Sequence, residues 1–141
     1  LIEYMPRANR RRISRKRRRS YKRIEILRSK WANMRKQAVG EYQKLSARIV
    51  NTENIIHNNL KMGKPFSPTE FNLLEAEVEQ ISRQTGKFMG KIQPYAYEEV
   101  SMEPFDMIHE LKNFGMLLID SVILYNTKFQ DSRLMKAFGL R

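Results

Sequence analysis

Arg7 to Lys36 reads RANRRRISRKRRRSYKRIEILRSKWANMRK, and the rest of the chain is organised around this stretch. It holds fifteen Lys and Arg against one acid, Glu25, a net charge of +14, whereas the whole chain carries +12. The high charge therefore belongs to this one segment, which we call the basic arm. So many neighbouring cations repel one another unless a polyanion neutralises them, so we expect the partner to be nucleic acid.

Most of the cations in the basic arm are Arg, whose planar guanidinium binds phosphate oxygens in pairs. Duplex DNA carries one charge per ~1.7 Å of axis, so the arm balances about seven base pairs. Side chains that read base edges are few, with Asn9, Asn33 and the adjoining Gln37 as the main candidates, which favours sequence-independent binding to the backbone. The predicted nucleic-acid-binding residues are Arg7, Arg10, Arg11, Arg12, Arg15, Lys16, Arg17, Arg18, Arg19, Tyr21, Lys22, Arg23, Arg28, Lys30, Arg35 and Lys36.

Other interpretations of the basic arm explain less of it. A nuclear localisation signal needs only a short basic cluster, and a membrane-surface arm needs an apolar face, which Arg7–Arg23 lacks. A solvated, disordered tail is the third alternative. Tyr21 could stack on a base, whereas Trp31 lies on an apolar stripe and is predicted to pack in the core.

Apolar periodicity begins at Ile24 and predicts one long helix that ends at Met62, before Gly63 and Pro65. From Arg7 to Arg23 the periodicity is absent, so in isolation we expect this part to be unfolded until phosphate neutralises it and makes it helical. The apolar stripe of the predicted helix has one polar gap, at Thr52–Glu53. The stripe comprises Ile24, Leu27, Trp31, Met34, Ala38, Tyr42, Leu45, Ile49, Ile56 and Leu60.

A second helix is predicted from Pro68 to Ile92 because Ser67 and Glu70 form a capping-box pattern, with Phe66 and Phe71 as a hydrophobic staple. After a loop, a third helix opens near Pro104, followed by a broken amphipathic segment that ends near Gly139. No segment has a strand pattern. We therefore predict an all-α fold. Its basic N-terminal helical arm (1–36) continues into a long helix, and two further helices and a short C-terminal segment complete a small bundle and assembly domain (37–141).

The residues needed for most enzyme and metal chemistry are missing. The chain has no Cys, and neither His57 nor His109 has a second His or Cys beside it in the sequence. No nucleophile accompanies the Glu98–Glu99 pair, and no run of ~20 apolar residues could span a bilayer. We expect no enzyme activity, no metal, no cofactor and no membrane-spanning segment.

The run Phe114–Tyr125 is apolar on nearly every side, which is more apolar helix surface than a body of this size can bury. Asp120 inside the run must find a partner or stay near an edge. We therefore predict contacts with copies or paralogues of the chain. The predicted subunit-interface residues are Phe114, Leu117, Leu118, Val122, Tyr125, Phe129 and Phe138.

This arrangement resembles the major capsid proteins of filamentous archaeal double-stranded-DNA viruses, the rudivirus, lipothrixvirus and tristromavirus group. The residues that carry the resemblance are the arm Arg7–Lys36 and the helical segments Pro68–Ile92 and Pro104–Phe138. The resemblance is architectural and spans the whole chain. It implies that the arm wraps A-form DNA while the C-terminal helices form the wall of a nucleoprotein filament, often built from a pair of related subunits.

The sequence thus predicts a capsid subunit of a filamentous virion that packages double-stranded DNA. The alternative is a mitochondrial ribosomal protein whose basic extension binds ribosomal RNA, and a third class is an interaction module whose arm serves only as a localisation signal. The first residue is Leu1 instead of Met, which fits either a proteolytically matured virion protein or an organellar protein that has lost its transit peptide.

Overall fold

The computed structural model describes the backbone of residues 7–140 and the side chains of residues 20–140. The described residues form helices and turns, with no strand among them. Three helices are long: α1 (Arg7–Met62), α2 (Pro68–Ile92) and α3 (Met102–Phe129). A short 3₁₀ helix, η2 (Gln93–Tyr95), follows α2, and α4 (Arg133–Ala137) ends the chain. The predicted all-α fold is confirmed.

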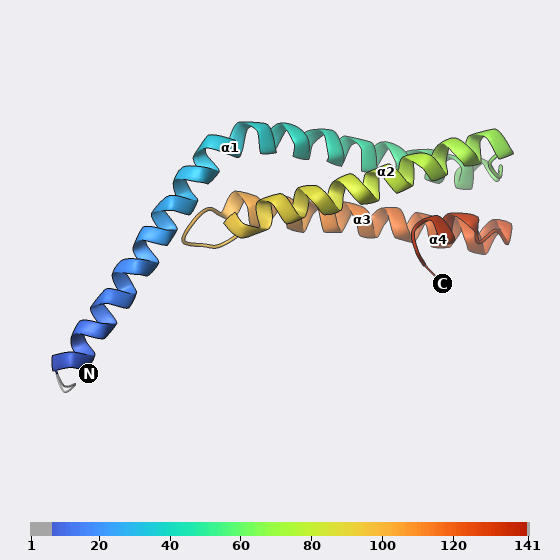
Figure 1. The fold of residues 1–141 in the computed structure, drawn as a ribbon. Coiled ribbons are helices and arrows are strands. Elements are labelled where there is room, and N and C mark those ends of the chain that lie inside the picture. The colour runs from blue at the N-terminus through green and yellow to red at the C-terminus, as the bar shows by residue number, and fades with distance from the viewer. Residues whose placement is uncertain (1–6, 141) are drawn as a thin grey trace.

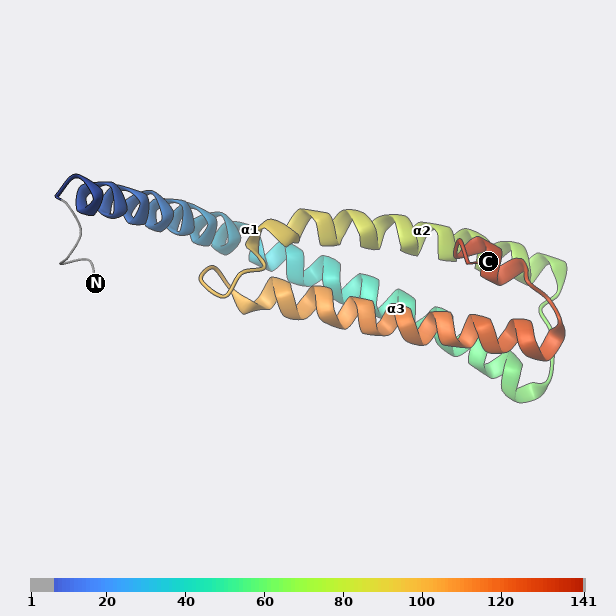
Figure 2. The ribbon, with the colours of Figure 1, turned by 90° about the horizontal axis from the view of Figure 1, so that it is seen from below.

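The three long helices run side by side in one elongated bundle, and the N-terminal part of α1 projects beyond it (Figures 1 and 2). The segment Arg7–Arg23, which lacks apolar periodicity, is helical in this structure, continuous with the rest of α1. Figure 1 shows a bend in α1 between its projecting blue part and the cyan part that lies along the bundle. A single helix therefore connects the basic arm to the body.

Helices α1 and α3 are parallel and in register. Four contacts join residues that are 68 positions apart. Arg35 pairs with Glu103, Tyr42 donates a hydrogen bond to Glu110, Ser121 donates one to Glu53, and Lys128 donates one to the carbonyl of Leu60. The constant offset means that the two helices stay aligned from the arm end of the bundle to the far end.

The predicted apolar stripe of α1 forms its side of the core. Trp31, Ala38, Leu45, Ile49 and Ile56 are buried, as predicted from the three-four spacing. The polar gap in the stripe has a structural explanation, because Thr52 is buried and its hydroxyl donates to the carbonyl of Arg48 at 2.8 Å. The carboxylate of Glu53 accepts a hydrogen bond from the hydroxyl of Ser121 at 3.1 Å. One hydrogen bond within α1 and one from α3 thus allow polar residues to continue the packed face.

Helix α2 begins as the sequence predicts. Ser67 caps it, with its hydroxyl accepting from the backbone N–H of Glu70 while the Glu70 carboxylate accepts from the backbone N–H of Ser67. Phe66 and Phe71 on either side of the cap are both buried. The backbone N–H of Phe66 donates to the hydroxyl of Tyr125 at 3.0 Å, so the start of α2 is fixed to the buried face of α3.

The remaining boundaries differ only slightly from the prediction. Helix α3 begins at Met102 and not at Pro104, because the hydroxyl of Ser101 accepts from the N–H of Glu103 and caps it earlier. The C-terminal segment is broken as expected, with Gln130 in the left-handed conformation between α3 and α4. None of the described helices is long and apolar enough to span a membrane.

Candidate nucleic-acid interface

The structure describes only part of the predicted nucleic-acid-binding surface. The side chains of Arg7, Arg10, Arg11, Arg12, Arg15, Lys16, Arg17, Arg18 and Arg19 lie outside the described residues, although their backbone is helical. Of the rest, Tyr21 is 68% exposed, and Lys22, Arg23, Lys30 and Lys36 are exposed without an ion pair among the described residues. These five side chains are accessible to a polyanion.

Arg28 and Arg35 contact the body instead. The Nε of Arg28 donates to the backbone carbonyl of Glu99 at 2.5 Å. The Nε of Arg35 donates to both carboxylate oxygens of Glu103, at 2.7 and 2.8 Å. The hydrogen bond from Arg35 lowers the pKa of Glu103, although partial desolvation opposes the shift. Phosphate would have to compete with these partners.

Trp31 packs in the core, as its position on the apolar stripe predicts. Its side chain is 4% exposed, and its ring lies 5.9 Å from that of Tyr95 at the end of η2. Together with Arg28 and Arg35, this contact shows that the body already packs against α1 before residue 36. Contacts between α1 and the body therefore begin within the predicted arm (1–36).

The predicted subunit-interface residues divide into two groups. Leu118, Val122 and Tyr125 are buried inside this chain's own bundle, with 2%, 0% and 0% exposure. Their prediction as interface residues is corrected, because the face of α3 that carries them packs against α1 and the start of α2. Leu117 is 57% exposed, whereas Phe114, Phe129 and Phe138 are half-buried against the core. Met116, Ile123 and Leu124 are also exposed and apolar, but they were not among the predicted subunit-interface residues.

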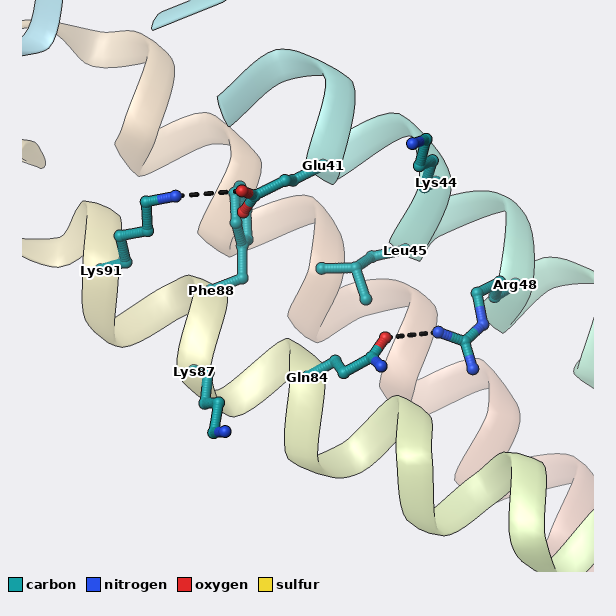
Figure 3. Close-up of a pocket in the computed structure, with 8 residues that line it drawn as sticks. All are labelled: Glu41, Lys44, Leu45, Arg48, Gln84, Lys87, Phe88 and Lys91. Carbon is teal, nitrogen blue, oxygen red and sulfur yellow. Dashed lines mark hydrogen bonds and ion pairs between the residues drawn. The ribbon is translucent and has the colours of Figure 1, made fainter. Parts of the chain in front are cut away.

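A groove of about 370 Å³ between α1 and α2 brings together cations that were not predicted as a site (Figure 3). We call it the α1–α2 groove, and its lining residues are Glu41, Lys44, Leu45, Arg48, Gln84, Lys87, Phe88 and Lys91. Leu45 and Phe88 are buried and form its floor. The i, i+4 spacing of the cations on each helix was visible in the sequence, but the pairing of α1 with α2 was not.

Two of the four cations in the groove are already paired. Arg48 donates to Glu77 at 2.7 Å and also to Gln84, as drawn in Figure 3, and Lys91 donates to Glu41 at 3.0 Å. Lys44 and Lys87 have no ion-pair partner among the described residues. The groove thus combines an apolar floor with two uncompensated positive charges.

Within residues that the structure describes, no group of three or more His, Asp or Glu is arranged to hold a metal ion. Asp120, which had to find a partner or an edge, is exposed on α3. Comparison with protein-family models finds no match, and neither the curated proteins nor the solved structures include a significant match to this chain.

Proposed function

We propose that this chain is a structural subunit that packages double-stranded DNA in a filamentous nucleocapsid. One observation carries the proposal: most of the stretch with a net charge of +14 lies on the N-terminal part of α1, which projects from the helical body (Figure 1). A projecting cationic helix can lie along a phosphate backbone while the body remains available for contacts with neighbouring subunits. The exposed Lys22, Arg23, Lys30 and Lys36 continue the positive surface toward the body.

The dimensions of the arm suggest how many copies serve one length of duplex. At ~1.5 Å per residue, Arg7–Lys36 is about 45 Å long, and about 45 Å of duplex carries roughly 26 phosphate charges. One arm with a charge of +14 therefore neutralises about half of the DNA beside it. Two arms on opposite sides of the duplex neutralise nearly all of it, which corresponds to about seven base pairs per subunit.

The test is a titration of long duplex DNA with the protein, followed by nuclease digestion and electron microscopy. We expect regular filaments and saturation at about seven base pairs per subunit, independent of sequence. Binding should weaken with a log–log salt slope of roughly −6 to −12 if about seven to thirteen phosphates are engaged. A slope near about −2, or saturation without filaments, would contradict packaging.

The same titration separates this proposal from the ribosomal alternative. A capsid subunit should bind long duplex DNA and assemble on it, whereas a ribosomal protein should prefer structured ribosomal RNA and remain unassembled. If the protein prefers that RNA in competition and forms no filament on DNA, the ribosomal alternative would be supported and the capsid proposal rejected.

A further inference from the structure

Helix α3 exposes a row of large apolar side chains. Met116 and Leu117 are 63% and 57% exposed, and Ile123 and Leu124 are 42% and 57% exposed. Their three-four spacing places them on one face, together with the exposed Asp120 at its centre. We call this face the α3 ridge. Exposed large apolar side chains gathered on one face of a helix are typical of an interaction site.

The α1–α2 groove has the complementary properties. Its floor is apolar, and Lys44 and Lys87 at its rim lack acidic partners among the described residues. The α3 ridge is apolar apart from Asp120, an acid that forms no ion pair within the described part of the chain. A helix that lays an apolar face in a groove is a common mode of recognition, and opposite charges at the rim set its orientation.

The two surfaces lie on different sides of the molecule. In Figure 3, α1 and α2 lie in front and the groove opens between them, whereas α3 passes behind. The buried residues Leu118, Val122 and Tyr125 face α1 and α2, so the α3 ridge faces away from the bundle. A chain therefore cannot place its own ridge in its own groove.

We propose that the α3 ridge of one copy docks in the α1–α2 groove of the next, with Asp120 lying between the rim that carries Lys44 and the rim that carries Lys87 (Figure 3). The contact joins two different surfaces, so it is heterologous and repeats head to tail. A repeated contact of this type produces an open helical filament unless its rotation closes a ring. This docking rests on the proposed function, because it presupposes a filament. It adds the two surfaces that join the subunits.

Charge reversal tests the docking directly. In the variant Asp120→Lys, a cationic ridge meets the native cationic groove, and in the double variant Lys44→Glu/Lys87→Glu, the native acidic ridge meets an acidic groove. We expect each variant alone to lose filament formation, measured by sedimentation velocity and electron microscopy with duplex DNA. An equal mixture should form filaments again, because every ridge then finds an oppositely charged groove when the two variants alternate.

The matched control is Lys61→Glu/Lys64→Glu, which reverses two exposed lysines outside the groove and should assemble like the wild type. Circular dichroism should show unchanged helix content in every variant. Variants that assemble alone, or a mixture that fails to assemble, would overturn the docking. So would a wild-type protein that stays monomeric at all concentrations.

Site-specific crosslinking gives an independent measurement, because the chain has no native Cys. A mixture of Asp120→Cys and Lys87→Cys proteins should form a covalent dimer with a short bismaleimide, while Asp120→Cys mixed with Lys61→Cys should not. Equal yields from both mixtures would contradict the inference. Binding to a short duplex, measured in parallel, reports on the basic arm alone, so loss of docking and failure of the proposed DNA function are distinguished.

Discussion

The two halves of α1 are helical for different reasons. From Ile24 to Leu60 the helix carries an apolar stripe whose buried residues, such as Ile49 and Ile56, pack against the other helices. From Arg7 to Arg23 it has no such stripe and projects beyond the bundle (Figure 1). Helix propagation costs little once a helix is nucleated, so the packed half can extend into a segment rich in Arg and Lys, which have good helix propensity.

This difference separates stability from binding along one helix. Substitutions in the packed half should change the free energy of unfolding, and substitutions in the projecting half should change affinity for polyanions. Charge repulsion in the projecting half also predicts that its helix becomes more stable when phosphate is bound.

The largest expected effect is on binding by the arm. If Arg15, Arg18, Lys22 and Arg23 contact phosphates as proposed, replacing all four with Gln should make the log–log salt slope shallower by about 4 units. Affinity for every duplex sequence should fall by roughly three orders of magnitude or more near 0.1 M salt. Fluorescence anisotropy over a salt series measures both quantities, and thermal unfolding of the body should be unchanged.

The control for this variant removes the same charge from the body. Lys61, Lys64, Lys112 and Lys136 are exposed and lie outside the arm, so their replacement with Gln should leave most of the salt slope intact. An equal loss of affinity in both variants would mean that net charge matters and the position of the arm does not. A loss confined to one DNA sequence would indicate base readout.

The next effect concerns the packed half and its partner α3. Leu118 is 2% exposed, so Leu118→Ala should lower the free energy of unfolding by about 2–5 kcal/mol through lost burial and a cavity. Its neighbour Leu117 is 57% exposed, and Leu117→Ala should leave unfolding nearly unchanged while weakening assembly. Urea denaturation and sedimentation of both variants test the assignment, which fails if the two substitutions destabilise equally.

The contrast between Leu117 and Leu118 also shows where sequence reasoning ends. The end of α1 and the start of α2 followed from local signals, namely Gly63 after the last turn of α1 and the capping box at Ser67 and Glu70. The face of α3 that is buried had no such signal, because Phe114–Tyr125 is apolar on nearly every side. Only the contact with α1 determines which of its side chains enter the core.

The same limit applies to the candidate site. The charge of the arm is a local property, so its residues could be predicted directly. The α1–α2 groove depends on how Lys44 on α1 meets Lys87 on α2, and nothing in either segment alone specifies that pairing. The ion pair of Arg35 with Glu103, which takes Arg35 from the exposed cations of the arm, likewise depends on the parallel register of α1 and α3.

A smaller effect should appear at high pH. Burial, together with the hydrogen bond to Glu110, raises the pKa of Tyr42 to about 12 from its ordinary value of 10.0. The folded state therefore holds this proton more tightly than the unfolded state, so the stabilisation is fully present below pH 10 and is lost as pH rises toward 12. Between these values the wild type should lose more stability than Tyr42→Phe in urea denaturation.

The exposed Tyr97 provides the control, because Tyr97→Phe should follow the wild-type pH curve. All other ionisable groups are common to the compared proteins, so their contributions cancel in the comparison. Superimposable curves for the wild type and Tyr42→Phe would show that the Tyr42–Glu110 contact adds no pH-dependent stability.

The smallest expected effect lies at the junction of the two halves, where Arg35 is shared between the body and a polyanion. In Glu103→Gln the carboxylate that holds Arg35 loses its charge, so Arg35 becomes available to phosphate and the salt slope should become steeper by about 1 unit. Ser101 still caps α3 through the N–H of residue 103, and the ion pair is exposed, so thermal unfolding should change little.

The control is Glu98→Gln, which removes an equal charge from the adjoining loop. Glu98 has no ion-pair partner among the described residues, so this variant measures the general effect of losing one negative charge near the arm. A steeper slope in Glu103→Gln alone would place Arg35 among the phosphate contacts. Equal slopes in both variants would instead assign Arg35 to the packed half of α1, and would move the end of the nucleic-acid surface toward the N-terminus.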